Sequence, residues 1–342
     1  MQSGKKTLFN IVFLLAVFGL TVYGVFHGED LGAMMDAIRS SQIGWLVPGV
    51  GLVVFFIWGE SIIIWYMMQS FGIRLKKRVC FLFSSVGFFF SCITPSASGG
   101  QPMQIYYMKK EKIPIPVSTV VLMVVTITYK LVLVVIGLGI MIFARGFLHH
   151  YLEGILPVFY LGLALNVFCV TLMTVLVFHP VLAREMLLKG MGLLERLHLM
   201  KKKEARRQKL NDSMEVYRET AVYLKDHKRV LFHVIIITFL QRMALFSVTW
   251  FVYRAFQMQG TPAVDVVLLQ AVISVSGDML PLPGGMGISE TLFLNIFAPV
   301  FRQVLLPAMV LSRGLGYYSQ LLISALFTVA AQLHYTNEED GP

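Results

Sequence analysis

Five ionisable side chains lie inside long apolar stretches of this sequence of 342 residues: Glu60, Lys130, Arg242, Glu290 and Arg313. An ionised side chain at the centre of a membrane costs about 3 kcal/mol on insertion scales, so it tends to face a partner or a watery cavity. Three cations and two acids around one cavity would suit an anionic group such as a lipid phosphate. Arginine offers a planar fork to phosphate oxygens, and lysine offers a point charge. The alternative for each residue is a structural ion pair between helices, or snorkelling near an interface.

Two of these cations occupy comparable places in the two halves of the chain. Lys130 and Arg313 each lie in the apolar stretch that follows a cluster of glycine and proline, whereas Glu60 and Arg242 lie in the stretches that precede one. We expect Arg313 and Lys130 to contact the phosphate. Glu290 is expected to orient Arg313 or to meet a positive head group.

The two glycine-proline clusters interrupt apolar sequence, one from Thr94 to Pro102 and the other from Pro281 to Glu290. Each has about fifteen mostly apolar residues on either side, whereas a spanning helix needs roughly 20. Each cluster therefore predicts a helical hairpin that enters the bilayer and leaves by the same face, and Asp278 is expected to cap or hinge the second hairpin. Broken backbone at membrane depth is tolerated only where protein buries it or where it lines a cavity. Paired interruptions of this kind indicate a transport site.

The elements that must position these residues follow from the composition, which is 56% hydrophobic and 14% charged. Soluble domains carry about 25% charged residues, so the chain is predicted to be an all-α polytopic membrane protein. It should have about six full-span helices and two oppositely oriented re-entrant hairpins. The predicted spans are 7–27, 45–71, 117–144, 155–178, 231–253 and 304–331, and the predicted hairpins are 79–108 and 263–300.

These elements form two inverted units, 45–144 and 231–331, within a single membrane domain that covers residues 1–342. Each unit has a spanning helix, a hairpin and a second spanning helix, and the two units run in opposite directions. The alternative is that the clusters are ordinary loops of a bundle of eight or ten helices. The first apolar run is interpreted as a retained helix and not as a cleaved signal peptide, because no small-residue cleavage site follows it.

Basic loops set the predicted orientation. Lysine and arginine cluster at residues 74–78, 109–112 and 184–229, which places these segments and both termini in the cytoplasm. Segment 184–229 has apolar residues at helical spacing among its charges, so it should form basic amphipathic helices that bind an anionic lipid surface. The alternative is a solvated loop that only sets topology. The net charge of +10 is attributed to these segments and not to nucleic-acid binding.

The sequence contains no pattern for hydrolysis, redox chemistry or metal binding. Cys80, Cys92 and Cys169 are scattered in apolar surroundings, without the spacing of a metal or redox site. His149 and His150 are adjacent and cannot share one helix face as a metal pair. No P-loop is found, so no cofactor and no metal are expected.

The second cluster resembles the proline-glycine-glycine-x-glycine-x-x-glutamate signature of the lysylphosphatidylglycerol synthase transmembrane (flippase-like) family. The first cluster, with Pro95, Gly99, Gly100 and Gln101, and the following Tyr106 match another hallmark of that family. Arg313 falls where the family has an arginine, and Ser289 replaces an arginine that often precedes the glutamate. The resemblance covers nearly the whole chain. Besides the five ionisable residues, the clusters and the resemblance give these candidate substrate-binding residues: Ser98, Gly99, Gly100, Gln101, Tyr106, Gly284, Gly285 and Gly287.

The resemblance implies a flippase in a bacterial-type plasma membrane. Its substrate would be an anionic or aminoacylated phospholipid, similar to lysyl-phosphatidylglycerol, or a lipid linked to polyprenyl phosphate. The best-known members carry a C-terminal transferase domain, whereas this sequence ends at Pro342. We therefore expect a stand-alone member that does not transfer lysine by itself. The alternatives are an intramembrane enzyme acting on a lipid phosphate, and a membrane subunit that recruits a lipid synthase. The protein partners considered are such a synthase and a second copy of the chain.

Overall fold

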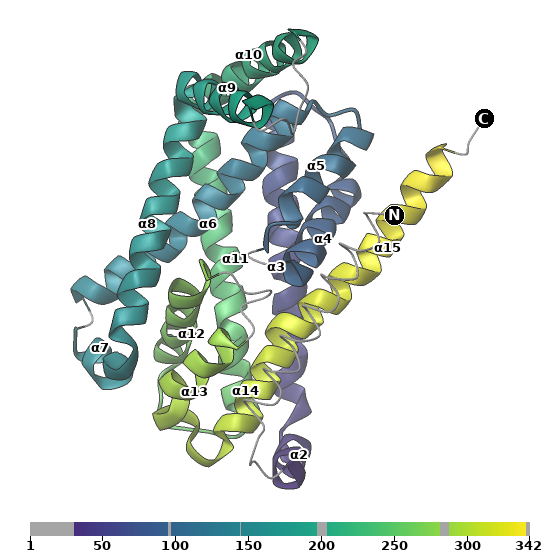
Figure 1. The fold of residues 1–342 in the computed structure, drawn as a ribbon. Coiled ribbons are helices and arrows are strands. Elements are labelled where there is room, and N and C mark those ends of the chain that lie inside the picture. Colours follow the sequence, from purple (N-terminus) through teal and green to yellow (C-terminus); the bar gives the residue numbers. More distant parts are fainter. Residues whose placement is uncertain (1–30, 95–96, 144, 197–203, 281–286, 340–342) are drawn as a thin grey trace.

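The computed structural model describes residues 31–94, 97–143, 145–196, 204–280 and 287–339 (Figure 1). All regular elements in these ranges are helices. Five of the described helical stretches are long and apolar enough to cross a membrane: Ile43–Ser70, Ile115–Phe143, Glu153–Phe178, Lys228–Ala255 and Ile288–Tyr335. The chain is thus an all-α polytopic membrane protein, as predicted. The predicted first span, 7–27, lies outside the described residues.

The first glycine-proline cluster separates two short helices, α4 (Lys77–Ile93) and α5 (Gly100–Lys110). Thr94 ends α4 with extended backbone, φ −117° and ψ 146°, because the residue before a proline is disfavoured in the helical region. The Thr94 hydroxyl then accepts a hydrogen bond from the backbone N–H of Gly99, at 2.9 Å. Local chemistry therefore both ends α4 and positions the start of α5.

The second cluster separates α12 (Ala263–Gly277) from α13 (Ile288–Phe301). Gly287, directly before α13, has φ 83°, which lies in the left-handed region that glycine adopts without steric cost. Its backbone N–H donates to Glu290 Oε2 at 2.7 Å, so this carboxylate caps the first turn of α13. The candidate residues Gly284 and Gly285 lie outside the described part of the chain.

The two pairs of short helices occupy opposite halves of an elongated bundle. In Figure 1, α4 and α5 lie in the half that ends at α9 (Pro180–Arg196) and α10 (Glu204–Asp226), whereas α12 and α13 lie in the half that ends at α2 (Leu31–Ser40). The outer ends of each pair lie together at one end of the bundle. This is the arrangement expected of two opposed hairpins, and their re-entry into a membrane stays a prediction.

The long helices make matching contacts in the two predicted units. The first helices of the units, α3 (Ile43–Ser70) and α11 (Lys228–Ala255), pack along each other. Each pair of short helices also packs on the last span of the other unit. α4 contacts α15 (Ser319–Glu339), and α12 contacts α6 (Ile115–Phe143). An inverted repeat would produce these reciprocal contacts, although the repeat itself stays a prediction.

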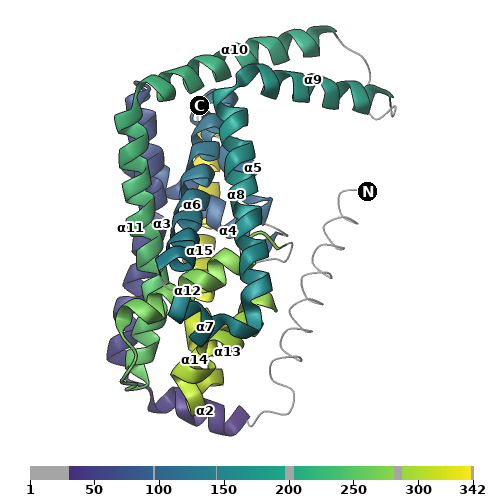
Figure 2. The ribbon, with the colours of Figure 1, turned by 90° about the vertical axis from the view of Figure 1, so that its left-hand side faces the viewer.

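The remaining helices complete the bundle. α8 (Leu156–Phe178) packs on α6 and α12, and α7 (Arg145–Leu152) precedes it at the end of the bundle near α13. The last span consists of α14 (Leu305–Arg313), a π-helical turn η5 (Gly314–Tyr318) and α15. Figure 2 shows α9 and α10 running across one end of the bundle, in the segment predicted to lie at the cytoplasmic surface.

Close backbone approach occurs where the helices meet in the middle of the bundle. A Cβ atom at Gly162 of α8 would lie 2.7 Å from Ser276 Cα of α12, and one at Gly59 of α3 would lie 2.9 Å from Gln241 Cγ of α11. Real Cβ atoms do not approach other heavy atoms so closely. The two glycines therefore allow α12 and α11 to pack tightly against their neighbours.

Candidate functional site

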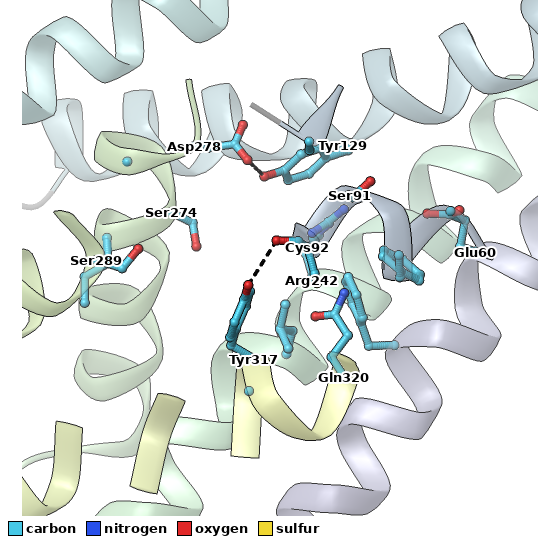
Figure 3. A pocket seen from close by; sticks show the side chains of 18 of the residues that line it. Glu60, Ser91, Cys92, Tyr129, Arg242, Ser274, Asp278, Ser289, Tyr317 and Gln320 are labelled. Atoms are coloured by element: carbon cyan, nitrogen blue, oxygen red, sulfur yellow. Dashed lines mark hydrogen bonds between the residues drawn. The ribbon is translucent and has the colours of Figure 1, made fainter. Parts of the chain in front are cut away.

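A cavity of about 590 Å³ lies inside the bundle, bounded by both pairs of short helices and by the spans around them. Its walls include residues of α3, α4, α6, α11, α12, α13 and the last span, with one residue of α8. Hydroxyl, amide and charged groups face it together with apolar side chains. The charged residues along its wall are Glu60, Lys130, Arg242, Asp278 and Arg313. Figure 3 labels Glu60, Arg242 and Asp278 among them. Four of the five ionisable residues predicted from the sequence therefore line one cavity.

Lys130 forms an ion pair across the predicted units. Its ammonium group lies on α6 and contacts Asp278 Oδ2 at the C-terminal end of α12. The hydroxyl of Tyr129 donates a hydrogen bond to the other oxygen of the same carboxylate, as Figure 3 shows. Asp278 caps α12, as expected, and it also neutralises Lys130. Among the described residues, the cavity wall and Glu290 together thus hold three acids and three cations, which is one acid more than predicted.

Arg313 forms the second ion pair. Its Nε lies 2.8 Å from Glu290 Oε1, and the Glu290 side chain is buried. Because Glu290 Oε2 also accepts from the backbone of Gly287, this carboxylate joins the start of α13 to the last span. Glu290 itself does not line the cavity but lies directly behind Arg313. The predicted role of Glu290 in orienting Arg313 would act through this contact and stays a prediction.

Tyr317 joins the last span to the first pair of short helices. Its ring lies 4.6 Å from the Arg313 guanidinium, and its hydroxyl donates to the backbone carbonyl of Cys92 at 3.0 Å. Tyr317 lies in the π-helical turn, and such turns often occur at functional sites. The C-terminal ends of α4 and α12, the first short helix of each pair, are thus held by the last span of the other predicted unit. Asp278 is held by α6, and Cys92 is held by η5.

Arg242 reaches the cavity from α11. Its guanidinium carbon lies 3.5 Å from the centre of the Tyr129 ring and 4.8 Å from that of Phe56. Within the described residues no carboxylate lies within ion-pair distance of Arg242, and its buried Nε has no hydrogen-bond acceptor. Two aromatic rings, and no carboxylate among the described residues, thus contact this guanidinium group.

Glu60 faces the cavity from α3 and is buried. Its Oε1 accepts a hydrogen bond from Gln104 Nε2 of α5 at 2.7 Å. Gln104 in turn packs closely on Gly87 of α4, because a Cβ atom at Gly87 would overlap Gln104 Nε2 and would force the Gln104 side chain to move. A neutral amide is thus the polar partner of this carboxylate in the described structure.

The other candidate residues lie in different surroundings. Ser98 and Gln101 line the cavity, and Gln101 donates to the Thr126 hydroxyl of α6. Gly99 and Gly100 form the start of α5, where Gly100 packs against the backbone of α4. Tyr106 does not line the cavity. Its side chain is 50% exposed on α5 and lies beside the Lys110 ammonium.

Several residues that line the cavity or support it were not identified from the sequence. Asp278 was expected only as a cap or hinge, and Tyr129, Tyr317 and Gln104 were not singled out. Tyr129 is adjacent to Lys130, and a polar ring next to an intramembrane cation could have indicated its role. Gln104 gives no such signal, because its partner Glu60 lies far away in the sequence.

A comparison of the sequence with known families identifies the family of this chain. The sequence profile of one family, described as the lysylphosphatidylglycerol synthase TM region, matches residues 8–324. The chain belongs to this family. No match was found among curated proteins. Membership of the lysylphosphatidylglycerol synthase TM family, together with the five candidate spans, makes the chain a multi-pass membrane protein associated with lipid synthesis or flipping.

The side chains that line the cavity of this family member can recognise a charged group. In the described ranges no three histidine, cysteine or acidic residues are close enough together to hold a metal ion. The cavity instead offers an arginine without a carboxylate partner, two ion pairs and several hydroxyl and amide groups. Such a set can bind a polar lipid head group inside a bundle whose outer face is apolar.

Proposed function

We propose that this protein moves a phospholipid, or a lipid linked to polyprenyl phosphate, between the two leaflets of a membrane. The observation that carries the proposal is the charged cavity between the two opposed pairs of short helices. A head group needs polar contacts to cross hydrocarbon, and broken helices at membrane depth supply them in transporters. The proposed substrate classes are anionic or aminoacylated phospholipids and polyprenyl-phosphate lipids.

The opposed pairs support alternating access to this cavity. The outer ends of the first pair lie toward the end of the bundle that carries α9 and α10, and those of the second pair lie toward the other end (Figure 1). If the two units rock against each other, each pair can uncover the cavity on its own side in turn. The two links at Asp278 and Cys92 join the units and would have to rearrange in such a movement.

The distribution of charge supports the proposed orientation. The outer ends of α4 and α5, which adjoin the basic segments 74–78 and 109–112, lie in the half of the bundle that ends at α9 and α10 (Figure 1). Basic residues favour the cytoplasmic side of a membrane. We therefore place this end in the cytoplasm, with both termini on the same side, and propose the bacterial-type plasma membrane as the location.

Leaflet exchange in vesicles tests the proposed function. The purified full chain is reconstituted into phosphatidylcholine vesicles that contain phosphatidylglycerol labelled on its acyl chain with a nitrobenzoxadiazole dye. Dithionite bleaches only the label in the outer leaflet. Exchange therefore appears as a loss of fluorescence larger than the fraction of labelled lipid that the outer leaflet holds. We expect such loss with the protein and not in empty vesicles. If protein-containing and empty vesicles bleach equally, while hydrolysis of the labelled lipid releases water-soluble glycerol phosphate, the protein is an enzyme and not a transporter.

A further inference from the structure

The three cavity cations differ in what neutralises them. Lys130 is paired with Asp278 and Arg313 with Glu290, and each pair also holds the end of a short helix. Arg242 has neither a carboxylate within ion-pair distance nor a hydrogen-bond acceptor among the described residues. A phosphate at Lys130 or Arg313 would meet a carboxylate already in place, whereas at Arg242 it would meet unoccupied donors.

The surroundings of Arg242 orient it for an anion. A guanidinium group has five N–H donors in one plane, and the central carbon of the Arg242 guanidinium lies close to the Tyr129 and Phe56 rings. Arg242 lines the cavity, and its two terminal amino groups can donate to two phosphate oxygens at once, which is a bidentate contact that arginine forms with phosphate. The buried Nε group also lacks an acceptor among the described residues, and a buried donor without a partner is costly.

We propose that Arg242 is the residue that binds the phosphate of the lipid, and that Lys130 and Arg313 position the two pairs of short helices. This inference deepens the function proposed above and rests on it. It differs from the expectation drawn from the sequence, in which Arg313 and Lys130 contact the phosphate. Glu60 faces the same cavity, but its carboxylate bonds to Gln104 and adds repulsion for an anion, not affinity.

Lipid binding to the full chain in neutral detergent tests the assignment. The probes are short-chain phosphatidylglycerol, which carries a phosphodiester, and farnesyl phosphate, which carries a phosphate monoester. Short-chain diacylglycerol serves as the probe without phosphate. Titration calorimetry is performed on the wild-type protein and on Arg242→Gln, Arg242→Lys and Arg254→Gln. Arg254 is the matched control, because it lies on the same helix but stacks on Trp45 and Trp250 and does not line the cavity.

We expect Arg242→Gln to weaken binding of the tighter phosphate probe by about tenfold or more, which corresponds to loss of hydrogen bonds to a charged group. Arg242→Lys should recover part of the affinity, and Arg254→Gln should bind as the wild type does. Glu60→Gln should bind the phosphate probe at least as tightly as the wild type. Whichever probe binds more tightly identifies the source of the phosphate.

Equal binding to the wild type and to folded Arg242→Gln would overturn the assignment and leave the proposed function standing if leaflet exchange persists. If Arg242→Gln does not fold, Arg242→Lys decides the question. Binding of the phosphate probe by Arg242→Lys as tightly as by the wild type would rule out the bidentate contact. A wild-type protein that binds neither phosphate probe more tightly than diacylglycerol, and exchanges no lipid, would overturn the proposed function as well.

Discussion

The ion pair between Lys130 and Asp278 should hold the end of α12 against α6. The perturbation that tests this is Asp278→Asn, which preserves the shape of the side chain and an acceptor oxygen for Tyr129 but removes the negative charge. Lys130 then remains in the protein interior without its counter-ion. The variant therefore isolates the charge from the hydrogen bond.

The magnitude follows from burial. The side chains of Lys130 and Asp278 are 9% and 19% exposed, and removing one partner of a buried ion pair costs about 3–5 kcal/mol. Asp278 also borders a polar cavity, which screens part of the interaction. We therefore expect Asp278→Asn to lower the free energy of unfolding by about 3 kcal/mol, the lower end of that range.

The assay is equilibrium unfolding of the purified protein in mixed micelles titrated with sodium dodecyl sulfate, followed by tryptophan fluorescence. Asp278→Asn, Lys130→Met and the double variant form a thermodynamic cycle. The double variant should lose less stability than the sum of the single variants, because it leaves no unpaired charge. If the losses simply add, or if Asp278→Asn unfolds like the wild type, the pair does not hold the helix end.

Three further predictions concern packing, topology and the membrane surface. Gly162→Ala should lower the free energy of unfolding by about 1–3 kcal/mol, because the new Cβ atom would meet the backbone of α12. Gly139 has open space around it, so Gly139→Ala should not destabilise the protein. Equal stability of the two variants would exclude the close approach of α8 to α12. Cysteines placed at 74–78 and at 109–112 should label from the same, cytoplasmic side, and labelling from opposite sides would exclude the hairpin. Neutralising Lys201, Lys202, Lys203, Arg206 and Arg207 in a peptide of residues 184–229 should weaken its binding to anionic vesicles, most clearly at low salt. If the unmodified peptide binds neutral and anionic vesicles equally, the contact is not electrostatic.

The spans and the interruptions could be predicted from the sequence because their causes are local. A long apolar run forms a helix in a membrane whatever its neighbours, so the prediction 45–71 corresponds to the helix Ile43–Ser70. The extended Thr94 before Pro95 and the positive φ of Gly287 likewise depend on one or two residues. Such features require no knowledge of the tertiary structure.

The partners inside the cavity could not be predicted because they depend on helix packing. Asp278 and Lys130 are far apart in the sequence, and only the contact of α12 with α6 brings them together. The same is true of Glu60 and Gln104. The cavity cations can therefore be recognised from the sequence, whereas the pairing of Lys130 and Arg313 and the contact of Arg242 with aromatic rings cannot.

Closing the cavity with a bulky side chain tests most directly whether lipid passes through it. Ser274 lines the cavity on α12, and Val329 of α15 is 60% exposed on the outside of the bundle. In the vesicle assay, Ser274→Trp should stop the exchange of labelled phosphatidylglycerol, whereas Val329→Trp should exchange it at the wild-type rate. Wild-type exchange by a folded Ser274→Trp protein would contradict the account, because lipid would then cross by another route.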